Sequence, residues 1–252
     1  MKQLLMSIIF IFFITGFAAA VETIHVGDSA VNANVLKPYK NRWKIINIDK
    51  DGTRKEQGVW TDEGIITTEN GRKIFQRIQD ETSPGSHFIT INFMDLETLT
   101  PIRSERKQEL GENPVDIKEE FHGKEVTSTC TGHPCQDKLK FADGENSRKV
   151  VLEEPIFDYM GGLWGMLFPT LPLKENADIR FPTFAETKGL VWVDIHVRGL
   201  ETVEAGPGKK VQAWAVEWPS KKWVFWITKE APYVIKLITP NPDGGSTNYE
   251  MF

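Results

Sequence analysis

The feature that most constrains the fold is an alternation of apolar and polar residues that runs from Arg42 onward in short stretches. Successive side chains of a β-strand point to opposite faces of a sheet, so a period of two indicates strands with one buried face. Turn residues such as Asp49-Lys50-Asp51-Gly52 and Glu69-Asn70-Gly71 separate the stretches and supply the positive φ angles of hairpins. Short joins favour pairing between sequential strands, so we expect a mainly β, antiparallel meander.

The expected strands are short and are separated by segments with Gly, Pro, Asn and Asp. Their ranges are 42–49, 58–61, 64–68, 72–79, 86–94, 101–107, 115–122, 125–130, 138–142, 148–152, 189–199, 209–218, 222–228, 233–239 and 247–252. The charged run from Arg103 to Glu109 is typical of a solvated edge strand, which resists pairing with a further strand.

One stretch, from Ile156 to Phe168, has apolar residues at spacings of three and four and predicts the one amphipathic helix. A helix this apolar needs a concave apolar surface. We therefore expect an open antiparallel half-barrel wrapped around the helix. Gly161 and Gly162 weaken the helix, and two interpretations stay open for them: close packing on the sheet, or close approach to a ligand. Pro169, Pro172 and Pro182 mark an irregular connection to the next strand.

The first twenty residues resemble a secretory signal peptide. Lys2 precedes an apolar run from Leu4 to Phe17, and Ala18-Ala19-Ala20 provides a small-residue cleavage site. A transmembrane anchor is the alternative, but spanning takes about 20 apolar residues. We expect cleavage after Ala20, a single domain over 21–252, and an exported, soluble and most simply periplasmic protein. No Cys follows the small-residue box, so the protein is not expected to be a lipoprotein.

Cys130 and Cys135 lie in Thr-Cys-Thr-Gly-His-Pro-Cys, four residues apart across a turn. In an exported chain this spacing favours a disulfide. Free thiols, and a metal or redox site with His133, are the alternatives. The redox motif has two intervening residues rather than four, and no further metal ligands lie nearby.

Composition excludes several classes of function. Lys and Arg sum to 30 against 35 Asp and Glu, and no basic cluster is denser than Lys209-Lys210 or Lys221-Lys222, so nucleic acid is not an expected partner. Two cysteines are too few for a four-thiolate zinc site, and the sequence has no Gly-rich phosphate loop, H-E-x-x-H pair or G-x-S-x-G elbow. We expect no cofactor, no metal and no catalytic residue.

The strand at 191–197 offers the one pair that suggests acid–base chemistry. Asp194 and His196 share the polar face of this strand. A solvated outer face has the same pattern, and no nucleophile is placed nearby, so we do not expect catalysis. The other histidines are scattered singly and recur at no metal-ligand spacing; they are His25, His87, His122 and His133.

The late hairpin is dense in tryptophan. Trp214 and Trp218 share one face of the strand at 209–218, while Ala213 and Ala215 lie on the other. Aromatic packing in the core is one interpretation, and the wall of a groove for an apolar ligand is the other. Such a groove would be formed by the helix and the late strands, with the candidate residues Phe157, Met160, Trp164, Leu167, Trp214, Trp223 and Trp226.

Several short motifs occur in a characteristic order over 153–252. They are Phe157-Asp158, Leu171-Pro172-Leu173-Lys174, Phe181-Pro182, Gly199-Leu200-Glu201-Thr202-Val203, Trp226-Ile227-Thr228-Lys229 and Tyr233-Val234-Ile235-Lys236, preceded by the connection Asp95 to Arg103. In this order the motifs resemble an uncharacterised bacterial family of exported proteins with a domain of unknown function. The cysteine pair, the Trp-dense hairpin and the turn Glu204 to Gly208 depart from the pattern.

The resemblance implies a fold similar to that of the lipoprotein localisation factors, an open half-barrel around a helix, and it implies no catalytic residue. Two functions follow as hypotheses. The first is a non-enzymatic envelope protein that binds an apolar ligand or lipid in the concavity of the half-barrel. The second is an envelope scaffold that contacts another protein and whose concavity is filled by its own helix.

Overall fold

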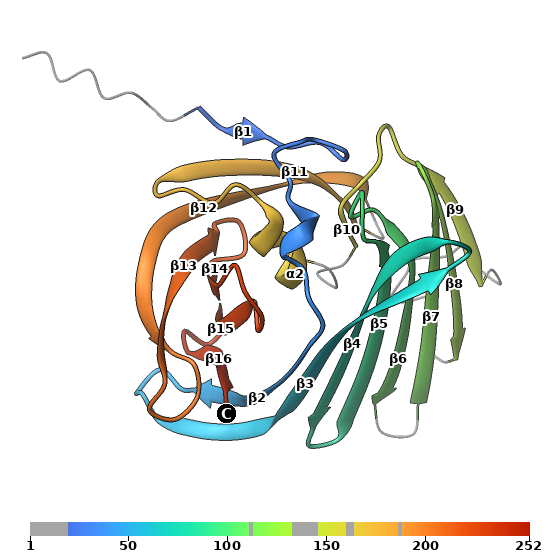
Figure 1. Cartoon of the computed structure of the whole chain (residues 1–252). Coiled ribbons are helices and arrows are strands. Elements are labelled where there is room, and N and C mark those ends of the chain that lie inside the picture. Colours follow the sequence, from blue (N-terminus) through green and yellow to red (C-terminus); the bar gives the residue numbers. More distant parts are fainter. Residues whose placement is uncertain (1–19, 111–112, 133–145, 160–163, 186–187) are drawn as a thin grey trace, which may run out of the picture.

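The computed structural model describes residues 20–110, 113–132, 146–159, 164–185 and 188–252. These residues form one highly curved sheet that surrounds a short helix (Figure 1). The mainly β, half-barrel fold predicted from the alternation is thus confirmed. The predicted signal peptide and the strand expected at 138–142 lie outside the described residues.

The elements follow one another along the chain with short joins. They are β1 (Glu22–Thr23), η1 (Ala33–Val35), β2 (Tyr39–Ile48), β3 (Arg54–Glu69), β4 (Arg72–Ser83), β5 (Ser86–Asp95), β6 (Pro101–Leu110), β7 (Asn113–His122), β8 (Glu125–Gly132), β9 (Ser147–Val151), β10 (Asp158–Tyr159), α2 (Trp164–Thr170), β11 (Ala177–Ala185), β12 (Gly189–Glu204), β13 (Lys210–Trp218), β14 (Trp223–Ile227), β15 (Val234–Pro240) and β16 (Ser246–Met251).

Two meanders make up the sheet. Strands β2 to β9 pair in sequence, as do β11 to β16, and the antiparallel pair β16–β2 joins the two series. The ends of the order are β9 and β1, which are not paired with each other in the described chain, so hydrogen bonds leave the barrel open there. Side chains cross this opening: Phe121 of β7 meets Phe184 of β11 edge to face, with ring centroids 6.4 Å apart.

Helix α2 lies inside the curved sheet (Figure 1). Met166, Leu167 and Phe168 are fully buried in the main core, and the Phe168 ring stacks edge to face on Phe225 of β14 at 5.1 Å. Burying apolar surface on all sides explains why a short helix with Gly165 and Pro169 persists here.

The helix is shorter than the spacing of apolar residues predicts. Residues 158–159 form β10, which pairs in parallel with Thr183 and Phe184 of β11, and the described helix begins only at Trp164. Ile156 and Phe157 are buried beside the sheet without being helical. Tertiary burial and strand pairing therefore override the local period at the start of this segment.

Three strand predictions were also wrong in detail. The two strands expected at 58–61 and 64–68 are one 16-residue strand, β3. The region of Pro182, expected to be irregular, lies within β11. Strand β6, expected at an edge because of its charges, pairs with both β5 and β7.

A second apolar cluster forms where the β12–β13 hairpin curls back over the outer face of β14 to β16. Ala205 near the hairpin turn packs with Ala213 and Ala215 of β13 and with Trp226 and Ile235. The other face of β13, with Trp214 and Val216, packs against the main core. Both faces of the tryptophan-rich strand are thus covered, which explains why both are apolar.

A buried ion pair interrupts the apolar interior. Arg77 of β4 donates to Asp62 of β3 at 2.9 Å through Nε and 2.7 Å through Nη2, and both side chains are almost fully buried. The Tyr39 hydroxyl donates to the same carboxylate at 3.1 Å. A β-carbon at Gly165 would lie 3.0 Å from an Arg77 nitrogen, so this ion pair packs directly against α2.

Candidate functional site

The structure does not bring the predicted groove residues together as one open wall. Phe157 and Leu167 are fully buried in the main core, and Trp226 is buried in the outer cluster. Trp214 and Trp223 are only partly buried and pack on the main core from the late strands. Met160, and the side chain of Trp164, lie outside what the structure describes.

A crevice does open beside Trp214, at the rim of the half-barrel. This rim crevice has a volume of about 470 Å³. Its walls come from the β12–β13 hairpin on one side and from the turn 228–232 and β15 on the other; the principal lining residues are Leu200, Val211, Trp214, Ile227, Pro232 and Ile235. A volume above 300 Å³ and mostly apolar walls are typical of sites for small ligands.

The rim crevice exists because β13 is longer than its neighbour. Pairing of β13 with β14 begins at Trp214, which lies opposite Ile227. Residues 210–213, at the start of β13, therefore extend beyond the end of β14. On the far side of β13, Leu200 of β12 lies opposite Trp214. Leu200 is 57% exposed, although a leucine side chain gains by leaving water. An exposed leucine beside a half-buried tryptophan provides an apolar surface that a ligand can cover.

Lys229 lines the rim crevice, and its side chain is partly buried. Its ammonium donates to the backbone carbonyl oxygens of Pro169 at 2.8 Å and Leu171 at 2.5 Å, at the end of α2. Burial lowers the pKa of Lys229 to about 8. In the described part of the chain no carboxylate lies within ion-pair distance of this amine.

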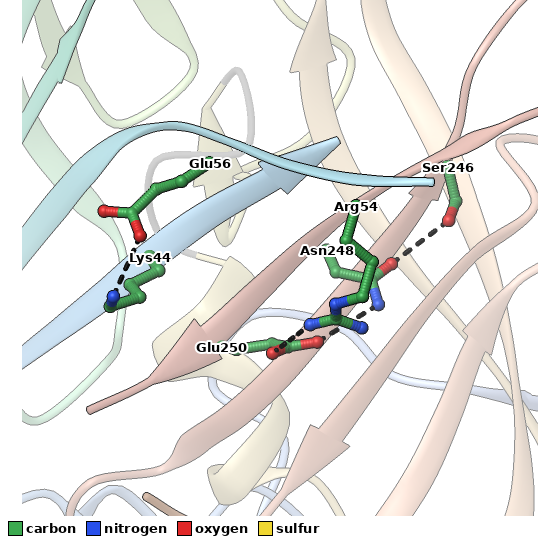
Figure 2. Close-up of polar contacts among 6 residues, drawn as sticks. All are labelled: Lys44, Arg54, Glu56, Ser246, Asn248 and Glu250. Carbon is green, nitrogen blue, oxygen red and sulfur yellow. Dashed lines mark hydrogen bonds and ion pairs between the residues drawn. The ribbon is translucent and has the colours of Figure 1, made fainter. Parts of the chain in front are cut away.

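An outer crevice of about 610 Å³ lies on the other side of the hairpin tip. It carries the cations Lys44, Arg54 and Lys236 above an apolar floor that includes Met251. Figure 2 shows that two of these cations already have partners: Lys44 meets Glu56, and Arg54 meets Glu250, both at 2.8 Å.

The acid of the second pair is held in its ionised form. Burial opposes ionisation of Glu250, but hydrogen bonds from Arg54 and Asn248 outweigh it and lower the pKa of the carboxyl. Figure 2 shows Asn248 in turn accepting from Ser246. Two of the three cations of the outer crevice are therefore already paired, and this arrangement favours a structural role for Lys44 and Arg54.

A third opening, about 1030 Å³, lies at the end of the sheet where the turns of β3–β4, β5–β6 and β7–β8 meet the chain before β2. Asp95 caps its own turn, because its carboxylate accepts from the backbone amides of Glu97 and Thr98 at 2.9 Å. The carboxylate of Asp95 in this third opening therefore serves its own turn.

The suggested acid–base pair does not form. Asp194 binds Arg180 at 2.6 Å, whereas His196 contacts Asp178 of β11 at 2.8 Å. Each is part of the charged outer face of β11 and β12, and the opposite face, with Val193, Ile195 and Val197, is buried as the alternation predicts. Among the described residues no group of three metal-ligating side chains occurs.

Cys130 is fully buried in β8, beside Val115 and Ile117 of β7, and is not a free thiol. Cys135 and His133 lie outside the described residues. The pairing of Cys130 with Cys135 therefore stays a prediction.

Sequence comparison decides the family. The model of the family described as "Protein of unknown function (DUF3108)" matches residues 92–251, which is more than half of the chain. The chain belongs to this family. The DUF3108 match begins in β5 and includes the β12–β13 hairpin and every lining residue of the rim crevice. It also includes the short motifs between Phe157 and Lys236 that carry the family resemblance.

One solved structure gives a likeness over most of the chain. It is the crystal structure of a beta-barrel-like protein of the domain of unknown function DUF1849 from Brucella abortus. The identity is 12% and the TM-score 0.47, over 88% of this DUF3108 chain and 98% of that chain. No curated protein matches the chain. In the part of the chain that the structure describes, no helix is long and apolar enough to span a bilayer.

Proposed function

We propose that this DUF3108 protein is an exported, non-enzymatic envelope protein that binds an apolar ligand in the rim crevice. The observation that carries the proposal is the exposed side chain of Leu200 beside the half-buried ring of Trp214, in a crevice of about 470 Å³. Leaving such surface in water is unfavourable by about 25 cal/mol per Å², and a ligand that covers it recovers this free energy.

The rim crevice replaces the concavity as the proposed ligand site. The helix side of the predicted groove, Phe157 and Leu167, is already packed in the core, and opening it would expose side chains that are now fully buried. Trp214 remains in the proposed site, now as part of a wall made by strands and a turn rather than by the helix.

The scaffold function is the second candidate, and the filled interior favours it. Helix α2 and the core side chains around it occupy the middle of the half-barrel. In this alternative the rim crevice has no ligand, and the protein acts through a surface that contacts another envelope protein.

A neutral fluorescent apolar probe such as N-phenyl-1-naphthylamine separates the two candidates. We expect saturable binding of the probe at micromolar concentration and a loss of roughly tenfold in affinity for Leu200→Ser, since about 1.4 kcal/mol of apolar contact is removed. Val151→Ser is the matched control, because Val151 is 71% exposed and lies on β9, outside the crevice. A folded protein that binds no probe leaves only the scaffold function.

Export is tested separately from ligand binding. We expect protein isolated from the cell envelope to begin at Val21, because Ala18-Ala19-Ala20 provides the small residues that signal peptidase requires. Intact-mass measurement reads this directly. A full-length species retained in the membrane contradicts the proposal of a soluble exported protein.

A further inference from the structure

The ammonium of Lys229 is a half-buried cation at the wall of an apolar crevice. Ions that leave water are normally paired with an opposite charge, because desolvation of an isolated charge is costly. Here the amine has two carbonyl oxygens and, among the described residues, no carboxylate within ion-pair distance. The lowered pKa of Lys229 has burial as its cause, which agrees with the lack of a carboxylate partner among the described residues.

The amine also has hydrogen-bonding capacity to spare. A lysine ammonium carries three donors, and the carbonyls of Pro169 and Leu171 use two of them. Among the described residues the third donor has no partner, and Lys229 lines the crevice whose apolar walls are formed by Leu200, Trp214 and Ile227.

The other charged residues of the crevice are Lys209 and Glu230, one of each sign. Together with Lys229 they leave one net positive charge on the lining. The lining of the outer crevice also carries one net positive charge, but there the amine of Lys44 and the guanidinium of Arg54 are each already paired with a glutamate (Figure 2). The half-buried amine of Lys229, which forms no ion pair among the described residues, therefore points to the rim crevice as the place for an anion.

We infer that the ligand of the rim crevice is a single-chain amphiphile with an anionic head, whose chain lies along Leu200 and Trp214 and whose head accepts a hydrogen bond from Lys229. This inference rests on the proposed function and specifies the class of its ligand. A carboxylate and a phosphate head can both accept this hydrogen bond, so the ligand is either a free fatty acid or a phosphate-bearing lipid with one chain.

The test compares four ligands of equal chain length below their micelle-forming concentrations: dodecanoate, dodecyl phosphate, dodecanol and dodecyltrimethylammonium. Each displaces the neutral probe from the purified protein. We expect one or both anions to bind at least about tenfold more tightly than the alcohol, the gain typical of a hydrogen bond to a charged group. Preference for the carboxylate identifies fatty acids, and preference for the phosphate identifies phosphate-bearing lipids.

Three variants assign the effect to the amine. Lys229→Met should abolish the advantage of the anions over dodecanol, whereas Lys229→Arg should keep it. Lys221→Met, a control at an exposed lysine in the turn before β14 and outside the crevice, should leave it unchanged. If Lys229→Met does not fold, the comparison of head groups on the unmodified protein decides alone.

The outcomes separate this inference from the proposed function. If the probe and dodecanol bind but the anions have no advantage, or if the cationic amphiphile binds best, the anionic class is wrong while the apolar site stands. If the advantage persists in Lys229→Met, the amine is not the recognition group and the inference is overturned. If none of the ligands nor the probe binds, both the inference and the proposed function fail.

Discussion

At the scale of single residues, the interior of the half-barrel depends on a polar cluster that the alternating pattern did not reveal. Asp62 and Arg77 occupy inward positions of β3 and β4, where the pattern predicts apolar side chains, and they compensate one another there. Their pairing joins residues of neighbouring strands at a register that only the folded sheet defines. The carboxylate accepts from Arg77 and from Tyr39, so the buried charge is fully engaged.

Asp62→Asn should destabilise the protein by roughly 3 to 5 kcal/mol, because it removes the Asp62 charge from a buried ion pair with Arg77. Glu63→Gln is the matched control, since Glu63 pairs with Lys40 on the exposed face and its loss should cost less than about 1 kcal/mol. Urea unfolding of both variants measures the difference. Equal losses of unfolding free energy in the two variants would show that the buried ion pair contributes no more to stability than the exposed one.

Tyrosine ionisation gives a prediction at high pH. Burial, and secondly the charge of Glu81, raises the pKa of Tyr249 to about 12, and burial raises the pKa of Tyr39 as well. Above pH 10 the unfolded chain loses phenolic protons that the folded chain retains, so stability should fall as pH rises beyond 10. Absorbance at 295 nm follows the titration, and Tyr249→Phe should remove a step near pH 12. Ionisation of all tyrosines near pH 10 in folded protein contradicts this prediction.

At the scale of elements, the sequence predicted most strands because their one-sided burial produces a period of two. It failed where pairing between strands overrode a local signal. Strand β6 is charged, yet Arg103, Glu105 and Lys107 lie opposite Glu120, Lys118 and Asp116 of β7, so opposite charges stabilise a central position in the sheet. The sequence of one strand does not show which charges the neighbouring strand will place opposite it.

Strand β11 was missed because of Pro182. This proline lies between residue 180, the last partner of β1, and residue 183, the first partner of β10. A missing backbone N–H is tolerated where the neighbouring strand changes, whereas a continuously paired strand would exclude proline. The predicted helix is longer than the observed one for a related reason. Residues 158 and 159, which the apolar spacing assigns to the helix, form β10 and pair with β11.

The β13–β14 pair provides a prediction on the two roles of its aromatic residues. Phe225 is fully buried against Phe168, so Phe225→Ala should cost roughly 3 to 5 kcal/mol. Trp214 is only partly buried at the rim crevice, so Trp214→Ala should cost less and should weaken binding of the neutral probe. Thermal unfolding and probe titration distinguish the roles. A larger loss of stability for Trp214→Ala, with probe binding intact, would place this ring in the core alone.

The predicted disulfide joins Cys130, in β8, to Cys135, which lies outside the described residues. We expect Cys130 and Cys135 to be linked, because an exported chain with two cysteines this close favours oxidation, and Cys130 is not free. Non-reduced peptide mapping should give one linked peptide containing both residues. Quantitative labelling by a thiol reagent before reduction, or a metal in the purified protein, would contradict the pairing.

At the scale of the whole molecule, the half-barrel could be predicted from sequence, whereas the candidate site could not. The rim crevice depends on β13 extending past β14, and on a lysine that reaches carbonyls about sixty residues away in sequence. These are tertiary relations with no local signature. Trp214 is predictable because aromatic density is visible in the sequence, but Leu200 and Lys229 stand out in the sequence only as parts of short family motifs.

The most direct test of the account is the place at which an apolar ligand binds. A dodecyl-chain ligand with a photoreactive diazirine should label, in a saturable manner, peptides from 200–214 and 227–235, which line the rim crevice. An excess of unmodified ligand should suppress this labelling. Labelling confined to residues 164–171, in the filled interior, or labelling that competitor does not reduce, would contradict the rim crevice as the binding site.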